Sequence, residues 1–349
     1  TDNLPTPAIS DPTAQFGQQL WTGDGTTGSA GTAVRTIATP GFDPDLVWMK
    51  GRSAGDLWQI GDITRGQYEV LNTAATGPQY DVTVDYGGGG YGTLGTKGYT
   101  IVAGTTNAGN YNANEATYVS WAWNAGTSTV TNTEGSVNAQ VRANPTAGFS
   151  ICNFTMGGGS TTIGHGLSQA PELIIFKSIE ATDGWYTQWA QLGNSVRLML
   201  NENTAKYTSS SSWGNTSPTA TVFTASINHS NPSVAYCFHS VEGFSKVGGY
   251  KGQAQDDGPF IYTGFRPRFV MLKSSTSGQH WNVYIDFPVS LTVSPNLNSA
   301  ARTMDDNPAM DYLSNGFKVR TSDGNMNTNN DTFVYVAFAE SPFKTSNAR

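Results

Sequence analysis

The chain has 349 residues, a formal net charge of −7, 13% charged residues and 11% aromatic residues. This aromatic content excludes an intrinsically disordered chain, and the acidic balance argues against a nucleic-acid partner, which would require a basic face. No apolar run is long enough to cross a bilayer, so we expect no membrane insertion.

The first 14 residues offer little that could be buried, and they include three prolines, Pro5, Pro7 and Pro12. Because ordering one residue costs about 1–2 kcal/mol of backbone entropy, such a segment stays ordered only where a partner holds it. Residues 1–14 are therefore predicted to form an extended arm that is either disordered or lies on a neighbouring subunit.

One pattern occurs three times along the chain. A proline is followed by a charged residue and four apolar residues, a lysine stands six positions after the proline, and a tryptophan stands eight positions after the lysine. The copies lie at 44–50 with Trp58, at 171–177 with Trp185, and at 267–273 with Trp281. Three copies with the same spacing indicate an internal repeat.

Each copy should form a β-hairpin. Proline fixes φ and has no N–H donor, so it suits the entrance of a strand. Four apolar residues in a row predict a strand that is covered on both faces. We expect Lys50, Lys177 and Lys273 to end their strands by returning to water. The tryptophans should then begin the next strand and pack in or against the core.

Further similarities follow each hairpin. A Leu-Asn pair comes after each tryptophan, at 71–72, 200–201 and 297–298, and each copy closes on an aromatic-rich run, at 118–123, 234–238 and 334–338. Few segments show a helical period. Copies of about 100 residues with frequent Gly, Pro and Asn turns predict an all-β chain of three tandem β-sandwich repeats.

These patterns also predict the boundaries of the repeats. The stretch between the first two copies is rich in Gly, Ser, Thr and Asn, which is typical of a linker. The predicted organisation is an arm at 1–14, repeat 1 at 15–125, a linker at 126–147, repeat 2 at 148–241 and repeat 3 at 242–349.

The two cysteines, Cys152 and Cys237, lie in apolar runs near the start and the end of repeat 2. Buried cysteine behaves as a small hydrophobic residue, so two free buried thiols are the favoured interpretation. A disulfide that joins the first and last strands of the repeat is the alternative.

Three aromatic residues in polar loops are the candidate binding residues: Tyr91, Tyr111 and Trp213. An aromatic ring flanked by Asn and Ser combines an apolar face with polar orienting groups, which suits stacking on a sugar. The alternative for each ring is that it folds back as a loop anchor or contacts a neighbouring subunit.

A weak candidate for a metal site is the run Asp323, Asn325 and Asn327, because oxygen side chains at alternate positions are typical of calcium loops. Asn and Asp also form turns, and the Gly and Glu of an EF-hand are missing at their required offsets. We therefore expect no cofactor, with Ca²⁺ at this run as the alternative.

The sequence gives little indication of an enzyme. Residues 51–55 match the G-x-S-x-G nucleophile elbow, but a strand-like segment follows where the elbow requires a helix. The adjacent acidic pairs, Asp256-Asp257 and Asp305-Asp306, are poor catalytic pairs, because neighbours on a strand point to opposite faces.

Several segments resemble a group of tailed-bacteriophage proteins. They are Gly164-His165-Gly166-Leu167 within 148–177, the run 257–267 beginning Asp257-Gly258-Pro259-Phe260, the ending 337–349 with Glu340-Ser341-Pro342-Phe343, and the first-copy segments 42–48 and Arg65-Gly66. The resemblance covers almost the full chain. It implies a virion or tail-fibre-like protein with lectin-like sandwiches of the concanavalin or jelly-roll kind, and it supplies no catalytic residues.

From this resemblance we expect a structural protein of the virion surface, a fibre or spike component that contacts host surface glycans. A capsid (head) decoration protein is the alternative, and a tailspike glycan depolymerase is a third reading. The expected partners are other virion proteins of the capsid or tail, further copies of this chain in a homo-oligomer, and a host surface glycan.

Overall fold

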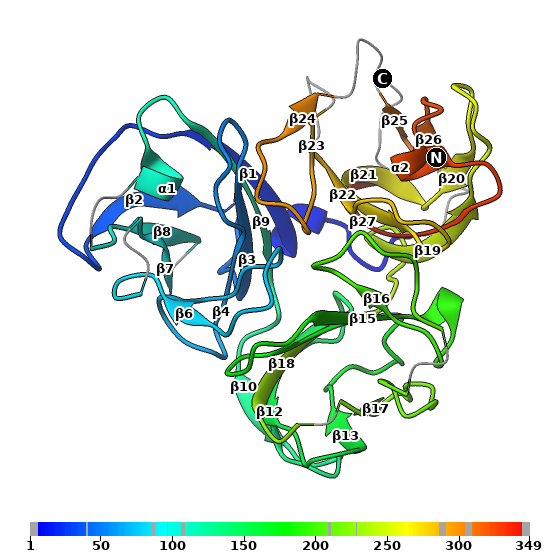
Figure 1. Ribbon diagram of the computed structural model, residues 1–349, viewed down its shortest axis with the longest axis horizontal. Helices are drawn as coiled ribbons and strands as arrows, with labels where there is room; N and C mark the ends of the chain where they lie inside the picture. The colour runs from blue at the N-terminus through cyan, green and yellow to red at the C-terminus, as the bar shows by residue number, and fades with distance from the viewer. Residues whose placement is uncertain are drawn as a thin grey trace.

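The protein is described by a computed structural model, which covers residues 6–39, 41–85, 88–95, 97–105, 109–208, 211–227, 229–285, 291–303 and 309–343. It is all-β, as predicted, with 45% strand and 4% helix. The strands form three lobes around a common centre (Figure 1). The first lobe contains β1 to β9, the second β10 to β18 and the third β19 to β27.

The first lobe is built on a four-stranded sheet in the order β1-β9-β3-β4. These strands are β1 (Phe16–Thr22), β9 (Thr117–Trp123), β3 (Leu46–Gly51) and β4 (Gln59–Asp62). The smaller elements are β2 (Ala33–Ala38), β5 (Glu69–Val70), β6 (Tyr80–Asp81), β7 (Gly90–Gly95), β8 (Gly98–Val102) and the short helix α1 (Gly109–Asn112).

The second lobe is built on a seven-stranded sheet in the order β10-β11-β12-β18-β14-β15-β16. These strands are β10 (Thr129–Asn132), β11 (Ala139–Asn144), β12 (Phe149–Thr155), β18 (Pro232–Phe238), β14 (Leu173–Ser178), β15 (Trp185–Trp189) and β16 (Leu198–Met199). A second sheet pairs β13 (Thr161–Gly164) with β17 (Val222–Ala225), and a 3₁₀ turn η2 covers Ala190–Leu192.

The third lobe is built on a six-stranded sheet in the order β19-β27-β21-β22-β23-β24. These strands are β19 (Ser245–Lys251), β27 (Thr332–Pro342), β21 (Phe265–Ser274), β22 (Asn282–Ile285), β23 (Leu291–Val293) and β24 (Arg302–Thr303). The smaller elements are β20 (Phe260–Tyr262), β25 (Met310–Leu313), β26 (Gly316–Val319) and the short helix α2 (Gly324–Asn327).

The three large sheets share one strand order at their centres: β1-β9-β3-β4, β12-β18-β14-β15 and β19-β27-β21-β22. Their registers also agree, since the three repeated lysines lie opposite Val119, Val234 and Val334 on the last strand of each lobe. The hairpin predicted at each copy of the pattern is present, and Trp58, Trp185 and Trp281 are all fully buried, as expected of core residues.

In the first two lobes, the two faces of the lysine-bearing strand serve different cores, which explains its run of apolar residues. On β3, Val47 and Met49 pack inside the first lobe, whereas Leu46 and Trp48 face the centre of the molecule. Because successive residues of a strand point to opposite faces, both sets must be apolar.

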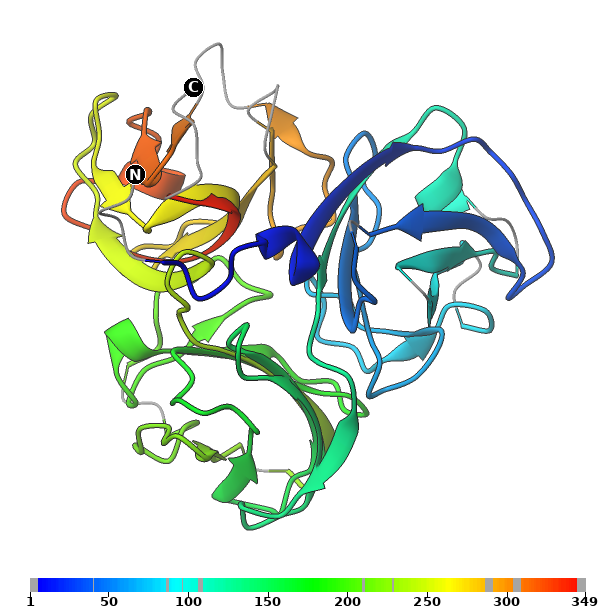
Figure 2. The same ribbon diagram turned by 180° about the vertical axis from the view of Figure 1, so that it is seen from behind.

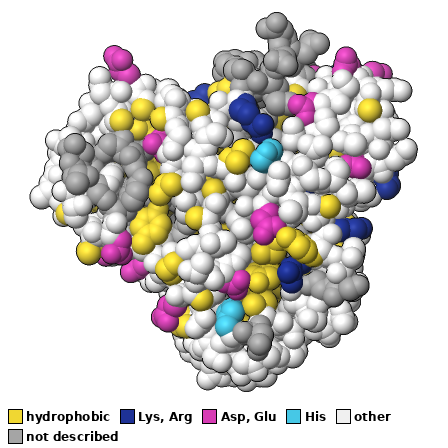
Figure 3. Space-filling view, in the orientation of Figure 1, with side chains coloured by type: hydrophobic (Ala, Val, Ile, Leu, Met, Phe, Trp, Pro, Cys, Tyr) yellow, Lys and Arg dark blue, Asp and Glu magenta, His cyan; other side chains and the backbone are white. Residues whose placement is uncertain are grey.

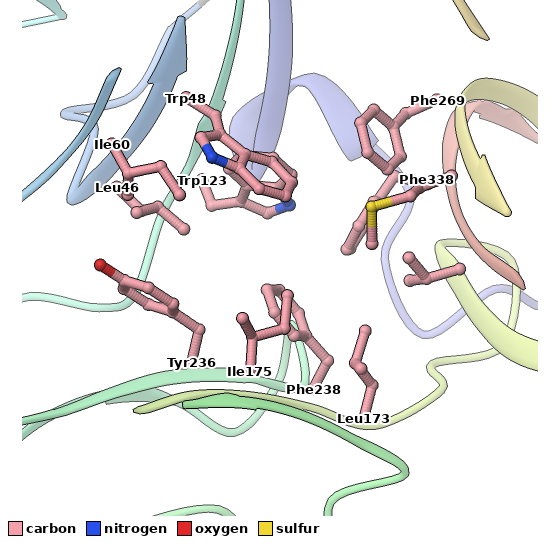
Figure 4. A pocket seen from close by; sticks show the side chains of 12 residues that line it. Leu46, Trp48, Ile60, Trp123, Leu173, Ile175, Tyr236, Phe238, Phe269 and Phe338 are labelled. Carbon is pink, nitrogen blue, oxygen red and sulfur yellow. The ribbon is translucent and has the colours of Figure 1, made fainter. Parts of the chain in front are cut away.

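At the centre of the molecule the three large sheets enclose a small apolar cavity of about 20 Å³ (Figure 4). Each lobe contributes four side chains to it: Leu46, Trp48, Ile60 and Trp123, then Leu173, Ile175, Tyr236 and Phe238, then Phe269, Met271, Val336 and Phe338. Only apolar atoms form the surface of this cavity, so we expect it to be dry. It is the centre of one core that all three lobes share.

The predicted linker at 126–147 is wrong, because most of it is folded into the second lobe. Strands β10 and β11 extend the large sheet, and Ala139 and Val141 of β11 are buried. The polar composition that indicated a linker instead suits β10, which forms the edge of the sheet and is mostly exposed.

The N-terminal segment lies on this chain's own third lobe, and Figure 2 shows it crossing from there to the first lobe. Ile9 is buried in the shared core, and Pro7 packs so closely on Gly243 that a Cβ there would lie 2.8 Å from the proline Cβ. Phe16 then stacks on Phe338 with ring centroids 5.0 Å apart. We call residues 6–14 the strap. Residues 1–5 of the predicted arm lie outside the described residues.

Candidate functional site

The repeated tryptophans join the lobes in a ring. Each indole N–H donates to a backbone carbonyl of a different lobe: Trp58 to Leu297 at 2.9 Å, Trp185 to Asn72 at 3.0 Å, and Trp281 to Met199 at 2.9 Å. The first lobe is thus bonded to the third, the third to the second, and the second to the first. Contacts of this head-to-tail kind close into a ring when the rotation between units allows it.

The repeated lysines do not return to water, and that expectation is wrong. Lys50, Lys177 and Lys273 are fully buried, and each ammonium group donates to backbone carbonyls. Lys50 reaches Asn298 O of the third lobe at 3.3 Å, and Lys177 reaches Thr76 O of the first lobe at 3.2 Å.

Burial disfavours the charged form of all three lysines. It lowers the pKa of Lys50 and of Lys177 to about 8, and that of Lys273 to about 7. On β3, Lys50 lies on the same face as Leu46 and Trp48, because residues two apart on a strand share a face. That face turns toward the other lobes, so a neighbouring lobe covers the position where an isolated sheet would meet water.

A buried ion pair also joins the first two lobes. Arg65 Nε lies 2.5 Å from Asp62 Oδ2 with both side chains inaccessible to solvent, and Tyr236 of the second lobe donates to the same carboxylate oxygen at 2.9 Å. Burial opposes ionisation of Asp62, but the Arg65 charge and the hydrogen bonds outweigh it and hold the pKa of Asp62 below its usual value. The carboxylate therefore stays charged inside the junction.

The three aromatic residues predicted to bind sugar are all buried, so that assignment is corrected. Tyr91 packs on Gly61, the Tyr111 hydroxyl donates to the carbonyl of Leu57, and Trp213 belongs to the core of the second lobe. A ring with no exposed face cannot stack on a ligand, so each ring acts as a loop anchor, which was the alternative interpretation.

The candidate calcium run caps a short helix instead. Asp323 Oδ1 accepts hydrogen bonds from the backbone and side-chain nitrogens of Asn325. Asn327 is buried, and its amide bonds Gln255 O, Thr321 O and the backbone N–H of Gln253. Across the described ranges, no group of three or more His, Cys, Asp or Glu side chains could hold a metal ion.

The other residues that the sequence singled out have structural roles. Strand β4 follows residues 51–55 where a nucleophile elbow would need a helix, and Asp257 pairs with Lys318 and Arg320 on the surface. The pair Asp305-Asp306 lies outside the described residues. Cys152 and Cys237 are free buried thiols, which confirms the favoured interpretation.

Sequence reasoning missed a surface group on the second lobe, which we call the Tyr207 cluster. It contains aromatic and charged side chains from four separate stretches: Asp183, Tyr186, Arg197, Glu202, Tyr207 and His229. The Arg197 guanidinium carbon lies 4.9 Å from the centroid of the Tyr207 ring and 5.2 Å from that of Tyr186. Figure 3 shows hydrophobic, basic, acidic and histidine side chains gathered on this face over the second lobe.

Hydrogen bonds fix the members of this cluster. Tyr186 Oη donates to Asp183 Oδ1 at 2.8 Å, Tyr207 Oη donates to Glu202 Oε2 at 2.7 Å, and Arg197 Nη1 donates to Ser212 Oγ at 2.7 Å. The members are far apart in the sequence and follow no motif. The spacing of residues therefore carried no signal for them.

The helices among the described residues are short, and none of them could span a bilayer.

Comparisons with known proteins add a family to this description. A search of curated proteins gave no match. A family model described as a domain of unknown function, DUF7483, matches residues 11–342, a range that includes every strand from β1 to β27. The chain therefore belongs to the DUF7483 family.

Proposed function

We propose that this protein is a structural component of a tailed-bacteriophage virion, displayed on the particle surface as part of a fibre or spike that contacts host glycans. Its three lobes are three tandem β-sandwich repeats of the concanavalin or jelly-roll kind. The common strand order and the common register of the repeated lysines support the repeats. The resemblance of several segments to phage virion proteins supports the location.

The observation that carries the structural role is the ring of tryptophan hydrogen bonds between the lobes. A linear array of domains bends at its linkers, because interfaces between neighbouring domains are usually small and polar. Here a shared apolar core and a closed set of bonds hold the repeats in one rigid block. A rigid block that presents many loops outward suits a protein that must survive outside the cell and display a surface.

The proposed partners are capsid or tail proteins and further copies of this chain. Immunogold electron microscopy of the intact phage particle, with antibodies raised against the purified protein, tests the proposal. Label at the tail or at fibres supports it, and label spread over the head identifies a decoration protein instead. Particles that carry no label, together with absence of the chain from their mass spectrum, overturn both versions.

A further inference from the structure

We propose that the Tyr207 cluster is a carbohydrate-binding site for an uncharged glycan. The part of the Tyr207 ring that the Arg197 guanidinium leaves uncovered would form the stacking platform, and Asp183, Arg197, Glu202 and His229 would supply the polar groups around it. This inference rests on the proposed contact with host glycans, and it identifies the part of the molecule that makes that contact.

The Tyr207 ring is exposed but held in place. The residue is 38% exposed, its backbone pairs with that of Arg197 through hydrogen bonds of 2.9 and 3.2 Å, and its hydroxyl is bonded to Glu202. Fixing a surface side chain costs conformational entropy that little burial offsets here. A ring fixed in advance loses less freedom when a ligand binds, and this preorganisation is a property of binding sites.

The groups beside the ring match the chemistry of a sugar. A pyranose has an apolar face of C–H groups and a rim of hydroxyls, so it needs an aromatic surface with acceptors and donors at its edge. Asp183 and Glu202 provide carboxylate acceptors, and Arg197 provides donors. The side chains of Asp183 and His229 remain 20% and 14% exposed, with His229 Nε2 3.5 Å from Asp183 Oδ2.

The balance of charge favours an uncharged ligand. Two carboxylates, Asp183 and Glu202, are offset by the Arg197 guanidinium and by the Lys177 ammonium, whose charge acts on Asp183. An anionic or cationic glycan would gain no net attraction from such a site, whereas hydroxyl groups can bond to both kinds of charge.

Corresponding positions in the other lobes lack this arrangement. Tyr186 lies opposite Phe176 in its hairpin, and the residues at the same place in the first and third lobes are Gln59, opposite Met49, and Asn282, opposite Leu272. Both of those amides are buried and bonded within their own lobes. The first and third lobes take part in the ring of tryptophan hydrogen bonds without such a cluster. The three-lobed architecture therefore does not require the cluster in the second lobe.

Saturation-transfer NMR on the purified chain tests this site, with hexasaccharides of glucose, mannose and galactose as uncharged probes and a galacturonic acid hexasaccharide as the anionic probe. We expect binding of at least one uncharged probe in preference to the anionic one. The variant Tyr207→Ala should weaken that binding by about tenfold, as expected for loss of a stacking residue. Tyr207→Phe should retain most of it, because the ring remains.

The matched control is Tyr262→Ala, which removes a tyrosine that is 60% exposed on the third lobe. It should leave sugar binding unchanged. If no probe binds, or if Tyr207→Ala binds as well as the wild type, the proposed site is wrong. Loss of particle incorporation by Tyr207→Ala without any sugar binding would make the cluster a protein contact and also overturn the proposal. Immunogold location is a separate result, so failure of this site can be told from failure of the virion assignment.

Discussion

The indole Nε1 of Trp281 lies 2.9 Å from the carbonyl oxygen of Met199, which fastens the third lobe to the second. The indole ring of Trp281 also stacks on that of Trp189 in the second lobe, with the two ring centroids 6.1 Å apart. A core residue of one lobe is therefore equally a residue of the interface with the next. Replacing such a residue should therefore lower the stability of the whole molecule and not of one lobe alone.

Replacement of Trp281 by alanine should lower the free energy of unfolding by about 3–5 kcal/mol, the usual cost of removing a buried large aromatic ring. Because the core is shared, we expect one cooperative transition at lower temperature. Calorimetry checks this. A separate unfolding transition of the third lobe at lower temperature would contradict the shared core. The control is Tyr262→Ala at an exposed position, which should change the free energy of unfolding by less than about 0.5 kcal/mol.

The strap should contribute to stability even though it precedes the first strand. Ile9 is buried in the shared core, so Ile9→Ala should cost about 2–5 kcal/mol. The neighbouring exposed Ser10 gives the matched control, Ser10→Ala, which should have little effect. Urea denaturation measures both. Equal midpoints for the two variants would show that the strap is not part of the core.

The buried ion pair makes a third prediction about the junction of the first two lobes. Asp62→Ala leaves the Arg65 guanidinium buried without its partner, so it should cost about 3–5 kcal/mol. Tyr236→Phe removes only the hydrogen bond to Asp62, and it should cost about 1–2 kcal/mol. Urea denaturation of both variants measures which of the two substitutions lowers the free energy of unfolding more. A larger loss for Tyr236→Phe than for Asp62→Ala would contradict the assigned roles.

The local pattern was enough to predict the hairpins. Proline, four apolar residues and a tryptophan at fixed spacing specify strand, loop and strand, and β3–β4, β14–β15 and β21–β22 are present. The same pattern could not show that the lobes close on one another. Lys50 looks like the solvated end of a strand until the third lobe, more than 200 residues away, covers it.

The errors about surface residues have the same cause. Tyr91, Tyr111 and Trp213 are flanked by small polar residues that indicate a solvated loop, yet each ring turns inward. Polar flanks report the backbone's environment and not the direction of the side chain. The Tyr207 cluster was invisible for the opposite reason, because Asp183, Arg197 and His229 meet only after the second lobe has folded.

The three buried lysines make the last prediction, which concerns pH. In the folded chain the pKa of Lys273 is about 7, and those of Lys50 and Lys177 are about 8, whereas an unfolded lysine titrates near 10.4. Between about pH 7 and pH 10 the unfolded state therefore binds more protons than the folded state, and stability rises with pH wherever that is so.

We expect the free energy of unfolding, measured by urea denaturation, to increase from pH 7 to about pH 9.5. Lys273→Met removes one of the three groups, so it should reduce this slope. Above about pH 10 the trend should reverse, because burial raises the pKa of Tyr118 to about 12 while an unfolded tyrosine loses its proton near 10. A stability that is flat or falling from pH 7 to pH 9.5 would show that the ammonium groups are as well stabilised by their carbonyl partners as they are by water.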